Sequence, residues 1–409
     1  MNIAVSVKAT TFHKGFGGLE TQNRVLCEGL VKKGHTVVVF SPKNEVKDTE
    51  ITENGVRYIF VNCIKPKFSI ITQWQKNSWY NMLLQSFAQE NSKSKFNLFI
   101  SQSSSGLSVI NRKKDIGIPV ISISHGTKSG EFQTRVNSIN SVTDVIKIFI
   151  DLPHVILNFF TVQRSFVHGS NLVVAVSNAV KQSLIEETFV DERKIKVIHN
   201  GVNTQLIPEN QQKGDEDFFE ESKIKLLYVG QIAKEKGLDY LFDILSDKRF
   251  SNFQLIAVGG GTYLDEFKEK VKAAGLSKKL VLKGKLDYSK VVSYYVLSHP
   301  DIFVFPTKRI EGFPMVLVEA MLASLPIVAF GLGGVPDAVI NGETGFVVRQ
   351  DDIESFKLRL LELANNQSLR QKMAENARIK ALNEFSLENM IQQYDQVISD
   401  VVFHKEKDI

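Results

Sequence analysis

The sequence predicts an α/β protein built from two parallel-sheet domains. Its 409 residues exceed what one hydrophobic core usually organises, and they suit two domains of about 200 residues each. Short runs of β-branched residues alternate with amphipathic stretches, which is the pattern of βαβ units. A polar segment without periodicity, residues 205–223, interrupts this alternation, which then starts again. We therefore expect a domain boundary near residue 205.

The strands expected in the first half are short apolar runs. They are NIAVSV at 2–7, HTVVVF at 35–40, NLFIS at 97–101, PVISIS at 119–124 and NLVVAVS at 171–177. A helix is expected from about Leu19 to Lys33, because Gly34 is a favourable residue just past a helix C-terminus. Residues 1–205 should thus form an N-terminal Rossmann-like domain.

The second half repeats the pattern. Its strand runs are KLLYVG at 225–230, FQLIAVGGG at 253–261, KLVLKG at 279–284, DIFVFP at 301–306, LPIVAF at 325–330 and TGFVV at 344–348. Residues 206–385 should therefore form a second Rossmann-like domain. Ser386 is an expected N-cap, and apolar residues at helical spacing follow it. This helix, in the segment 386–409, is expected to pack back toward the N-terminal domain.

Composition narrows the class of protein. Cys27 and Cys63 are the only cysteines, which argues against a disulfide framework and fits a reducing compartment, with the cytoplasm as the default. The N-terminus reads as a strand and not as a signal peptide. The net charge is +5, and residues 1–205 carry nine more basic than acidic residues. That excess can attract phosphates or an anionic membrane surface, whereas no basic run with interleaved aromatics indicates nucleic-acid binding.

One apolar segment bears on membrane contact. Residues 145–163 read VIKIFIDLPHVILNFFTVQ, with Lys147, Asp151, Pro153 and His154 as interruptions. A spanning helix needs about 20 mostly apolar residues, so this segment is a poor candidate for crossing a bilayer. It is either a helix lying on the membrane surface or a pair of core helices broken at Pro153, and the sequence leaves both open.

The stretch EGFPMVLVEA, residues 311–320, places two carboxylates eight positions apart in an apolar run. Pro314 suits the first position of a helix, whose free N–H groups favour an anion such as a diphosphate. Glu319 falls more than one turn into that helix, and a buried carboxylate needs partners. The hydroxyls of a diol beside the anion would supply them, and Glu311 would face the other end of the same ligand. The competing interpretation for Glu319 is a structural ion pair.

Most of the chain, roughly residues 2–385, resembles retaining GT-B glycosyltransferases of glycosyltransferase family four. Residues 311–319 resemble the E-x7-E signature of that family. Further matches follow in family order: GGLE at 17–20, SHG at 124–126, AVSNAV at 175–180, HNGVN at 199–203, VGQIAKEKG at 229–237, VGGG at 258–261 and GGVPDAV at 333–339. Each match is short, but their order and spacing together are specific.

The resemblance implies a GT-B fold, in which two Rossmann-like domains face each other across a cleft. It also implies transfer of a hexose or N-acetylhexosamine, with retained anomeric configuration and without a metal or cofactor. The donor would be a nucleotide-diphosphate sugar, with a UDP-sugar favoured, and the acceptor a glycan or lipid-linked hydroxyl. Such enzymes build cell-surface polysaccharides and glycoconjugates. The only D-x-D pattern, Asp215-Glu216-Asp217, falls in the polar segment and reads as a solvated linker.

The same resemblance assigns roles by position. Glu319 would bind the ribose hydroxyls, Glu311 would orient the transferred sugar, and Lys236 would neutralise the diphosphate. His125 would lie near the reacting carbon. The implied donor contacts are Gly17, Gly18, Asn200, Gln231, Lys236, Glu311, Gly312, Phe313, Pro314, Met315 and Glu319, of which Gly312 to Met315 act through the backbone. The structural alternatives are a hydrogen-bonded loop histidine for His125, a solvated lysine for Lys236 and simple turn glycines.

One position departs from the family. Where family members commonly carry an arginine directly after the strand-ending glycine, this chain has Gln231. Lys234, Lys308 and Arg309 are the available substitutes for that cation, and the sequence does not select among them. Our hypothesis is Arg309, because it lies in the turn before Glu311.

Three other functions compete with this interpretation. A dinucleotide-dependent oxidoreductase would need the pattern G-x-G-x-x-G. The pattern starts at Gly15, but its last position is Glu20 and not a glycine. A sugar-nucleotide epimerase or a phosphorylase of GT-B fold, or a non-catalytic sugar-nucleotide-binding subunit, would share the motifs. Residues 62–95 and 127–165 carry no transferable acceptor motif. The acceptor candidates there are Trp74, Trp79, Tyr80 and Arg135, and the acceptor, the donor sugar, the linkage and the oligomeric state stay undetermined.

Overall fold

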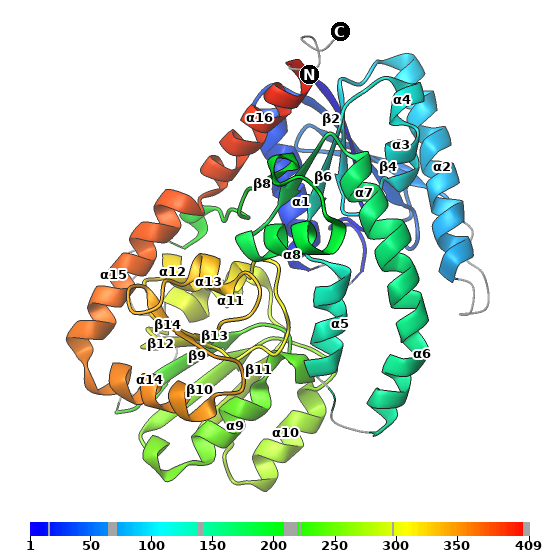
Figure 1. Ribbon diagram of the computed structural model, residues 1–409. Coiled ribbons are helices and arrows are strands. Elements are labelled where there is room, and N and C mark those ends of the chain that lie inside the picture. The colour runs from blue at the N-terminus through cyan, green and yellow to red at the C-terminus, as the bar shows by residue number, and fades with distance from the viewer. Residues whose placement is uncertain are drawn as a thin grey trace. The chain divides into compact units, whose positions relative to one another are not determined.

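A computed structural model describes residues 1–14, 17–63, 72–137, 139, 142–207, 219–220, 222–296 and 298–403 (Figure 1). The chain forms two compact units, and the predicted α/β class is confirmed. Unit 1 comprises Met1–Ser129, Asp151–Asn200 and Leu387–Ile409, and unit 2 comprises Gly130–Ile150 and Gly201–Ser386. The main crossing, at Asn200, lies close to the boundary expected at residue 205. The predicted linker, residues 205–223, falls largely outside the described residues, as do Gly15 and Asp215-Glu216-Asp217.

Unit 1 contains an eight-stranded sheet in the order β3-β4-β2-β1-β5-β6-β7-β8. All neighbours are parallel except β3 and β4, which form an antiparallel hairpin that the sequence analysis did not predict. The central strands are buried along their whole length, as expected of a sheet covered on both faces. The strands are β1 (Asn2–Ser6), β2 (Thr36–Pro42), β3 (Glu50–Glu53), β4 (Val56–Val61), β5 (Leu98–Gln102), β6 (Val120–Ser124), β7 (Leu172–Ala175) and β8 (Ile195–Val197).

The predicted helix at Leu19–Lys33 corresponds to α1 (Gly18–Lys32). The other helices before Asn200 are α2 (Thr72–Lys93), α3 (Leu107–Asn111), α4 (Lys113–Ile116), α5 (Lys128–Asn137), α6 (Val142–Asn158), α7 (Arg164–Gly169) and α8 (Asn178–Thr188), with the π-helix η2 (Phe159–Gln163) and the short 3-10 helix η3 (Glu192–Lys194). Pro153 lies inside α6 and does not end it, so the segment 145–163 forms one continuous helical stretch and not two helices broken at the proline.

The last helix, α16 (Leu387–Phe403), packs on α1 within unit 1, although it follows unit 2 in the sequence. The contact is close because Gly29 carries no side chain, and a Cβ there would meet Ile391 Cδ1 at 2.3 Å. His35 Nε2 lies 2.8 Å from Asp395 Oδ1 and fixes the register of α16. The expected terminal helix is therefore part of the first compact unit.

Unit 2 contains a six-stranded, fully parallel sheet in the order β11-β10-β9-β12-β13-β14. Its strands are β9 (Ile224–Val229), β10 (Phe253–Val258), β11 (Leu280–Gly284), β12 (Ile302–Phe305), β13 (Ile327–Phe330) and β14 (Gly345–Val348). The chain moves outward from β9 in one direction and from β12 in the other. The topological switch point therefore lies between β9 and β12, where open α/β sheets usually bind ligands at the carboxyl ends of the strands.

The helices of unit 2 include α9 (Leu238–Ser246), α10 (Leu264–Ala273), α11 (Tyr288–Val296), α12 (Met315–Leu322), α13 (Val335–Ala338), α14 (Ile353–Asn365) and α15 (Gln367–Glu384), with the 3-10 helices η4 (Thr204–Leu206), η5 (Lys234–Lys236) and η6 (Lys248–Phe250). The sheet core is rich in aromatic residues, and Tyr228, Phe303, Phe330 and Phe356 are fully buried. Among the described residues, no helix combines the length and apolarity required to cross a membrane.

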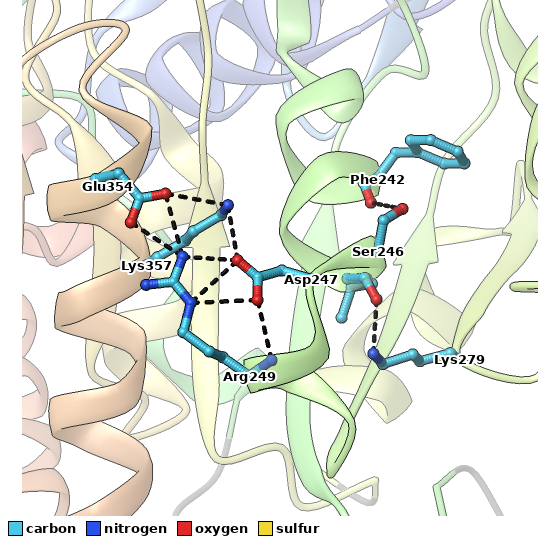
Figure 2. A network of polar contacts seen from close by, with 8 residues as sticks. Phe242, Ser246, Asp247, Arg249, Lys279, Glu354 and Lys357 are labelled. Atoms are coloured by element: carbon cyan, nitrogen blue, oxygen red, sulfur yellow. Dashed lines mark hydrogen bonds and ion pairs between the residues drawn. The ribbon is translucent and has the colours of Figure 1, made fainter.

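A polar network joins η6 to α14 (Figure 2). Asp247 accepts hydrogen bonds from Arg249 and Lys357, and Glu354 pairs with the same two cations. These contacts hold the pKa of the Asp247 carboxyl below its usual range. Because each of the four charged groups finds an opposite charge inside the network, we interpret it as a structural clamp and not as a ligand site.

Candidate functional site

The loops that follow β9 and β12 are bound to each other at the switch point of unit 2. The Lys308 backbone N–H donates to Glu235 O at 2.9 Å. Gly237 ends η5 with a φ of +74°, and a Cβ at this residue would lie 1.9 Å from Pro306 O. Only glycine permits this approach. The KEKG sequence therefore brings Lys236 against the loop that leads to Glu311.

Three charged side chains meet where these loops touch. The Lys236 ammonium forms an ion pair with Glu311 Oε1, and the Arg309 Nε lies 3.9 Å from Glu311 Oε2. The Lys236 and Glu311 side chains are largely buried, whereas 47% of the Arg309 side chain is exposed. Glu311 uses one of the three donors of Lys236, and among the described residues no other hydrogen bond of this ammonium is seen. The cluster carries one net positive charge.

The backbone around Glu311 is fixed from two sides. Gly334 N–H donates to Glu311 O at 2.8 Å, and a Cβ on Gly333, whose φ is +55°, would lie 2.1 Å from that oxygen. On the preceding turn, Ile310 N–H donates to Thr134 Oγ1 at 3.0 Å. Thr134 belongs to α5, in the segment Gly130–Ile150 that clusters with unit 2 and not, as predicted, with the N-terminal domain. The sequence analysis missed this contact.

The other candidate cations have partners elsewhere. Lys234 pairs with Glu266 at 3.0 Å and lies over the ring of Tyr263. The Lys308 ammonium lies 4.6 Å from the centroid of the Tyr240 ring. Gln231 is exposed in the same loop as Lys234, and its backbone carbonyl accepts a hydrogen bond from the Tyr228 hydroxyl at 2.8 Å. Of the three possible substitutes for the missing arginine, Arg309 is therefore the one that the structure brings to Glu311.

Helix α12 begins at Met315, and Pro314 is its N-cap, one residue earlier in the helix numbering than the predicted first position. The Leu317 N–H bonds back to Pro314 O at 3.1 Å, and the other first-turn N–H groups have no intrahelical acceptor. Phe313 is buried against Phe385, with ring centroids 5.1 Å apart. Its side chain thus anchors the loop, while Gly312 lies partly buried beside it.

Glu319 has partners from the protein itself. Its side chain is buried on α12, and the Tyr288 hydroxyl of α11 donates to Oε1 at 3.1 Å. A second phenol of α11, that of Tyr295, lies near the carboxyl, and its hydroxyl donates to Val316 O at 3.3 Å. Burial raises the pKa of Glu319 to about 7, although both phenols lower it. The expected partner, a ligand diol, is therefore not required to explain why this carboxylate tolerates burial.

In unit 1, His125 follows β6 and is held by a buried amide. Its Nε2 lies 2.7 Å from Gln102 Oε1, and Gln102 Nε2 donates to Asn23 Oδ1 at 2.9 Å. Burial lowers the pKa of His125 to about 4, so the imidazole is neutral at pH 7. Gln102 and Asn23 were missed by the sequence analysis. A polar residue ending an otherwise buried strand was the available signal for Gln102.

The remaining candidate donor-binding residues of unit 1 are Gly17 and Gly18, at the start of α1, and Asn200. Gly17 is the N-cap of α1, Gly18 is its first residue, and a Cβ on Gly18 would meet no atom within 4 Å. Protein packing therefore does not explain this glycine. Asn200 is buried, and its Oδ1 has no hydrogen-bond partner within the described part of the chain.

Two of the proposed acceptor residues have a structural explanation. The Trp79 indole donates to Ser105 O at 2.8 Å, and the Tyr80 hydroxyl donates to Ser104 O at 3.1 Å. Both therefore secure the loop after β5. Arg135 is exposed on α5, and the side chain of Trp74 lies outside the described residues. Within the described ranges, no group of three or more His, Cys, Asp or Glu residues is arranged to hold a metal ion.

Both halves of the chain match glycosyltransferase family models. Residues 16–206 match "Glycosyltransferase Family 4", and residues 210–380 match "Glycosyl transferases group 1". Solved structures agree over nearly the whole chain. A sucrose-phosphate synthase from Thermosynechococcus elongatus gives a TM-score of 0.80 at 19% identity and covers 97% of this chain and 98% of that one. The chain has the GT-B fold of the glycosyltransferases.

Several relatives named as glycosyltransferases are similar to part of the chain. The capsular polysaccharide biosynthesis glycosyltransferase CapM of Staphylococcus aureus is 32% identical over 52% of this chain and 57% of its own length. The UDP-Gal:alpha-D-GlcNAc-diphosphoundecaprenol alpha-1,3-galactosyltransferase of Escherichia coli is 26% identical over 57% of this chain and 61% of its own length. The Anabaena protein HepE, solved with UDP-glucose, gives a TM-score of 0.72 at 17% identity and covers 98% of this chain and 100% of that one. The chain spans somewhat over half the length of the two curated relatives, CapM and the galactosyltransferase, that it matches.

The environment of Glu319 predicts a distinct pH dependence of stability. Its folded pKa of about 7 lies above the ordinary 4.5, so between these values the folded state keeps a proton that the unfolded state releases. The free energy of unfolding should therefore fall as the pH rises from 5 to 8, by on the order of 3 kcal/mol at about 1.4 kcal/mol per pKa unit. Glu319→Gln should remove this loss when urea unfolding is measured at both pH values.

The matched control is Glu375→Gln, which changes an exposed carboxylate on α15. This variant should show the same pH dependence of the free energy of unfolding as the wild type. If Glu319→Gln and wild type lose the same stability between pH 5 and 8, the carboxyl is not held in the environment described here.

Proposed function

We propose that the protein transfers a hexose or N-acetylhexosamine from a nucleotide-diphosphate sugar, with a UDP-sugar favoured, to a hydroxyl of a glycan or lipid-linked acceptor. The observation that carries this proposal is the cluster of Lys236, Arg309 and Glu311 at the switch point of unit 2, next to the N-terminus of α12. Fixed cations and free helix N–H groups together favour a diphosphate. The two family matches support the same chemistry.

The residues would divide the work as follows. The first-turn N–H groups of α12 would bind the diphosphate, and Lys236 and Arg309 would neutralise the charge that grows on it as the bond to the sugar breaks. Cations fixed before the reaction stabilise the transition state more than the ground state. Glu311, held in place by Lys236, would accept hydrogen bonds from the transferred sugar. Glu319 would face the ribose hydroxyls, with the hydrogen bond from Tyr288 setting its orientation.

We propose that the anomeric configuration is retained. The acceptor hydroxyl would attack the reacting carbon on the side from which the diphosphate departs, and a leaving phosphate oxygen would take the hydroxyl proton. The new carbon–oxygen bond then replaces the broken one on the same face, and the charges balance without a protein nucleophile. Lys236 and Arg309 would do the work of a metal cation, so we propose no requirement for a metal or cofactor.

The names of the relatives support a choice of donor and acceptor. HepE was solved with UDP-glucose, and the name of the Escherichia coli relative specifies a UDP-sugar and a diphosphoundecaprenol-linked acceptor. CapM is named for capsular polysaccharide biosynthesis. These names support a UDP-sugar as donor and a growing, lipid-linked glycan as acceptor for this chain.

Replacing Glu319 and replacing Glu311 should affect different kinetic constants. Glu319→Gln should chiefly raise the KM for the nucleotide sugar, because it changes the hydrogen bonds offered to the nucleotide. Glu311→Gln should chiefly lower kcat, by about a hundredfold, because it changes contacts that orient the reacting sugar. Steady-state kinetics of sugar transfer measure both. If the two variants have equal and small effects, neither carboxylate takes part in donor binding or transfer, and both have a structural role.

Arg309 and Lys308 provide a matched pair of controls for the phosphate cation. Arg309→Ala should weaken binding of the nucleoside diphosphate about tenfold, because a charge-assisted contact is lost. Lys308→Ala should leave it unchanged, since that ammonium lies over the Tyr240 ring. Unchanged donor affinity and rate in Arg309→Ala would remove Arg309 from the site.

We further propose that the protein contacts the cytoplasmic face of an anionic membrane through α6 and η2. Seven exposed apolar side chains recur at helical spacing along one face of this stretch: Val145, Ile146, Phe149, Ile150, Ile156, Leu157 and Phe160. Phe149 and Ile150 are 70% and 71% exposed. Such a face suits the headgroup boundary of a bilayer. The basic excess of residues 1–205 favours anionic lipids, and a lipid-linked acceptor would be presented there.

Co-sedimentation with vesicles tests this surface. Wild type should bind vesicles of mixed zwitterionic and anionic phospholipids, and Phe149→Ser with Ile150→Ser should reduce the bound fraction at least about fivefold, because the two side chains provide much of the buried apolar area. Leu358→Ser on α14, which replaces a side chain that is 57% exposed, is the control and should bind as wild type. If the double variant binds vesicles normally but changes from a dimer to a monomer, a second copy of the chain covers this face instead.

A further inference from the structure

Three elements of unit 1 are joined by one chain of hydrogen bonds through buried amides. Asn23 lies on α1, in the first turns after Gly17 and Gly18, Gln102 is the last residue of β5, and His125 follows β6. Asn23 and Gln102 are 2% and 4% exposed. Their bonds therefore form away from water, where leaving a polar group unpaired costs about 1–3 kcal/mol.

The polarity of this chain selects one form of the imidazole. Gln102 Nε2 is a donor and is used by Asn23 Oδ1, so the other amide atom, Oε1, faces His125. An oxygen acceptor requires a hydrogen on His125 Nε2, and the neutral ring then has a lone pair at Nδ1. Among the described residues, Nδ1 has no hydrogen-bond partner. The nitrogen that remains available to a substrate is thus an acceptor.

The backbone beside Gln102 is held in an unfavourable conformation. Ser103 has a φ of +52°, in the left-handed region that costs a non-glycine residue about 1–2 kcal/mol. Hydrogen bonds fix it there: Ser103 N–H donates to Ile123 O at 2.8 Å, and Ser101 Oγ donates to Ser103 O at 2.7 Å. Local strain of this kind is retained where surrounding contacts define a position closely. The turn at Ser103 therefore ends strand β5 immediately after Gln102.

We propose that Gln102 and Asn23 are positioning residues that hold His125 in one orientation and in the Nε2–H tautomer for sugar transfer. Asn23 fixes which end of the Gln102 amide faces the imidazole, and Gln102 fixes which imidazole nitrogen carries the hydrogen. This inference rests on the proposed function for the role of His125. The orientation of the imidazole itself depends only on residues of unit 1.

Nitrogen NMR of the ring atoms tests the tautomer without a substrate. The wild type should show His125 as a single Nε2–H tautomer, with a His125→Asn variant identifying its signals. Gln102→Met, which keeps the shape but not the hydrogen bonds, should give a mixture of tautomers. Asn23→Leu should do the same, because the Gln102 amide is then free to rotate, whereas Asn23→Asp keeps an acceptor and should restore the Nε2–H form.

Kinetics test the consequence for transfer. Gln102→Met and Asn23→Leu should lower kcat about tenfold with little change in the KM for the nucleotide sugar, and Asn23→Asp should recover most of kcat. Gln254→Met in unit 2 is the control for loss of a buried glutamine, since Gln254 bonds Glu220 N–H and Lys278 O. It should reduce stability but leave the His125 signals and kcat unchanged.

The two proposals fail in different ways. A wild-type His125 in the Nδ1–H form, or Gln102→Met with unaltered tautomer and kcat, overturns the positioning role. A mixed tautomer without any loss of kcat also overturns it, because positioning would then have no effect on transfer. If no sugar transfer is detected with wild type while the ring spectra behave as expected, the proposed function fails and the hydrogen-bonded orientation of His125 stands.

Discussion

The ion pair between Lys236 and Glu311 is the contact on which the candidate site depends. It joins the loop after β9 to the loop after β12, the two strands that flank the switch point of unit 2. Gly237 permits the approach, and the backbone bonds to Glu235 O and Glu311 O hold both loops in register. Because Glu311 is neutralised by Lys236 and flanked by Arg309, an anionic ligand meets a net positive charge beside a helix N-terminus.

The sequence correctly predicted the structural elements that depend on local residue patterns, namely strands and helix ends. The parallel strands appeared as β-branched runs, and Gly34 located the end of α1 within a residue or two. The antiparallel hairpin β3–β4 was missed, although its turn carries the signal in Asn54 and Gly55, both of which adopt positive φ. Pro153 was weighed as a helix break, but α6 continues through it. The hairpin was thus missed despite a local signal, whereas the effect of Pro153 depends on what packs against its helix.

The candidate residues were named from the sequence, but their contacts were not. Glu311 and Lys236 were named from motif positions and Arg309 from its place in the turn before Glu311, and the structure brings these three together. Tyr288, the partner of Glu319, lies on α11, and Gln102, the partner of His125, ends β5 and is itself bonded to Asn23 of α1. Sequence spacing gave no signal for these contacts. The buried carboxyl of Glu319 needed a hydrogen-bond partner, and the structure provides one in Tyr288, a residue that the sequence had not marked.

The central claim is that the cluster of Lys236, Arg309 and Glu311 binds the diphosphate of a nucleotide. Titration calorimetry with UDP, GDP and ADP, in buffer containing a metal chelator, tests it most directly. At least one diphosphate should bind, roughly tenfold or more tighter than the corresponding monophosphate, because the monophosphate loses charge-assisted contacts to Lys236 and Arg309. Absence of binding by all three nucleotides, or equal affinity for mono- and diphosphate, would contradict it.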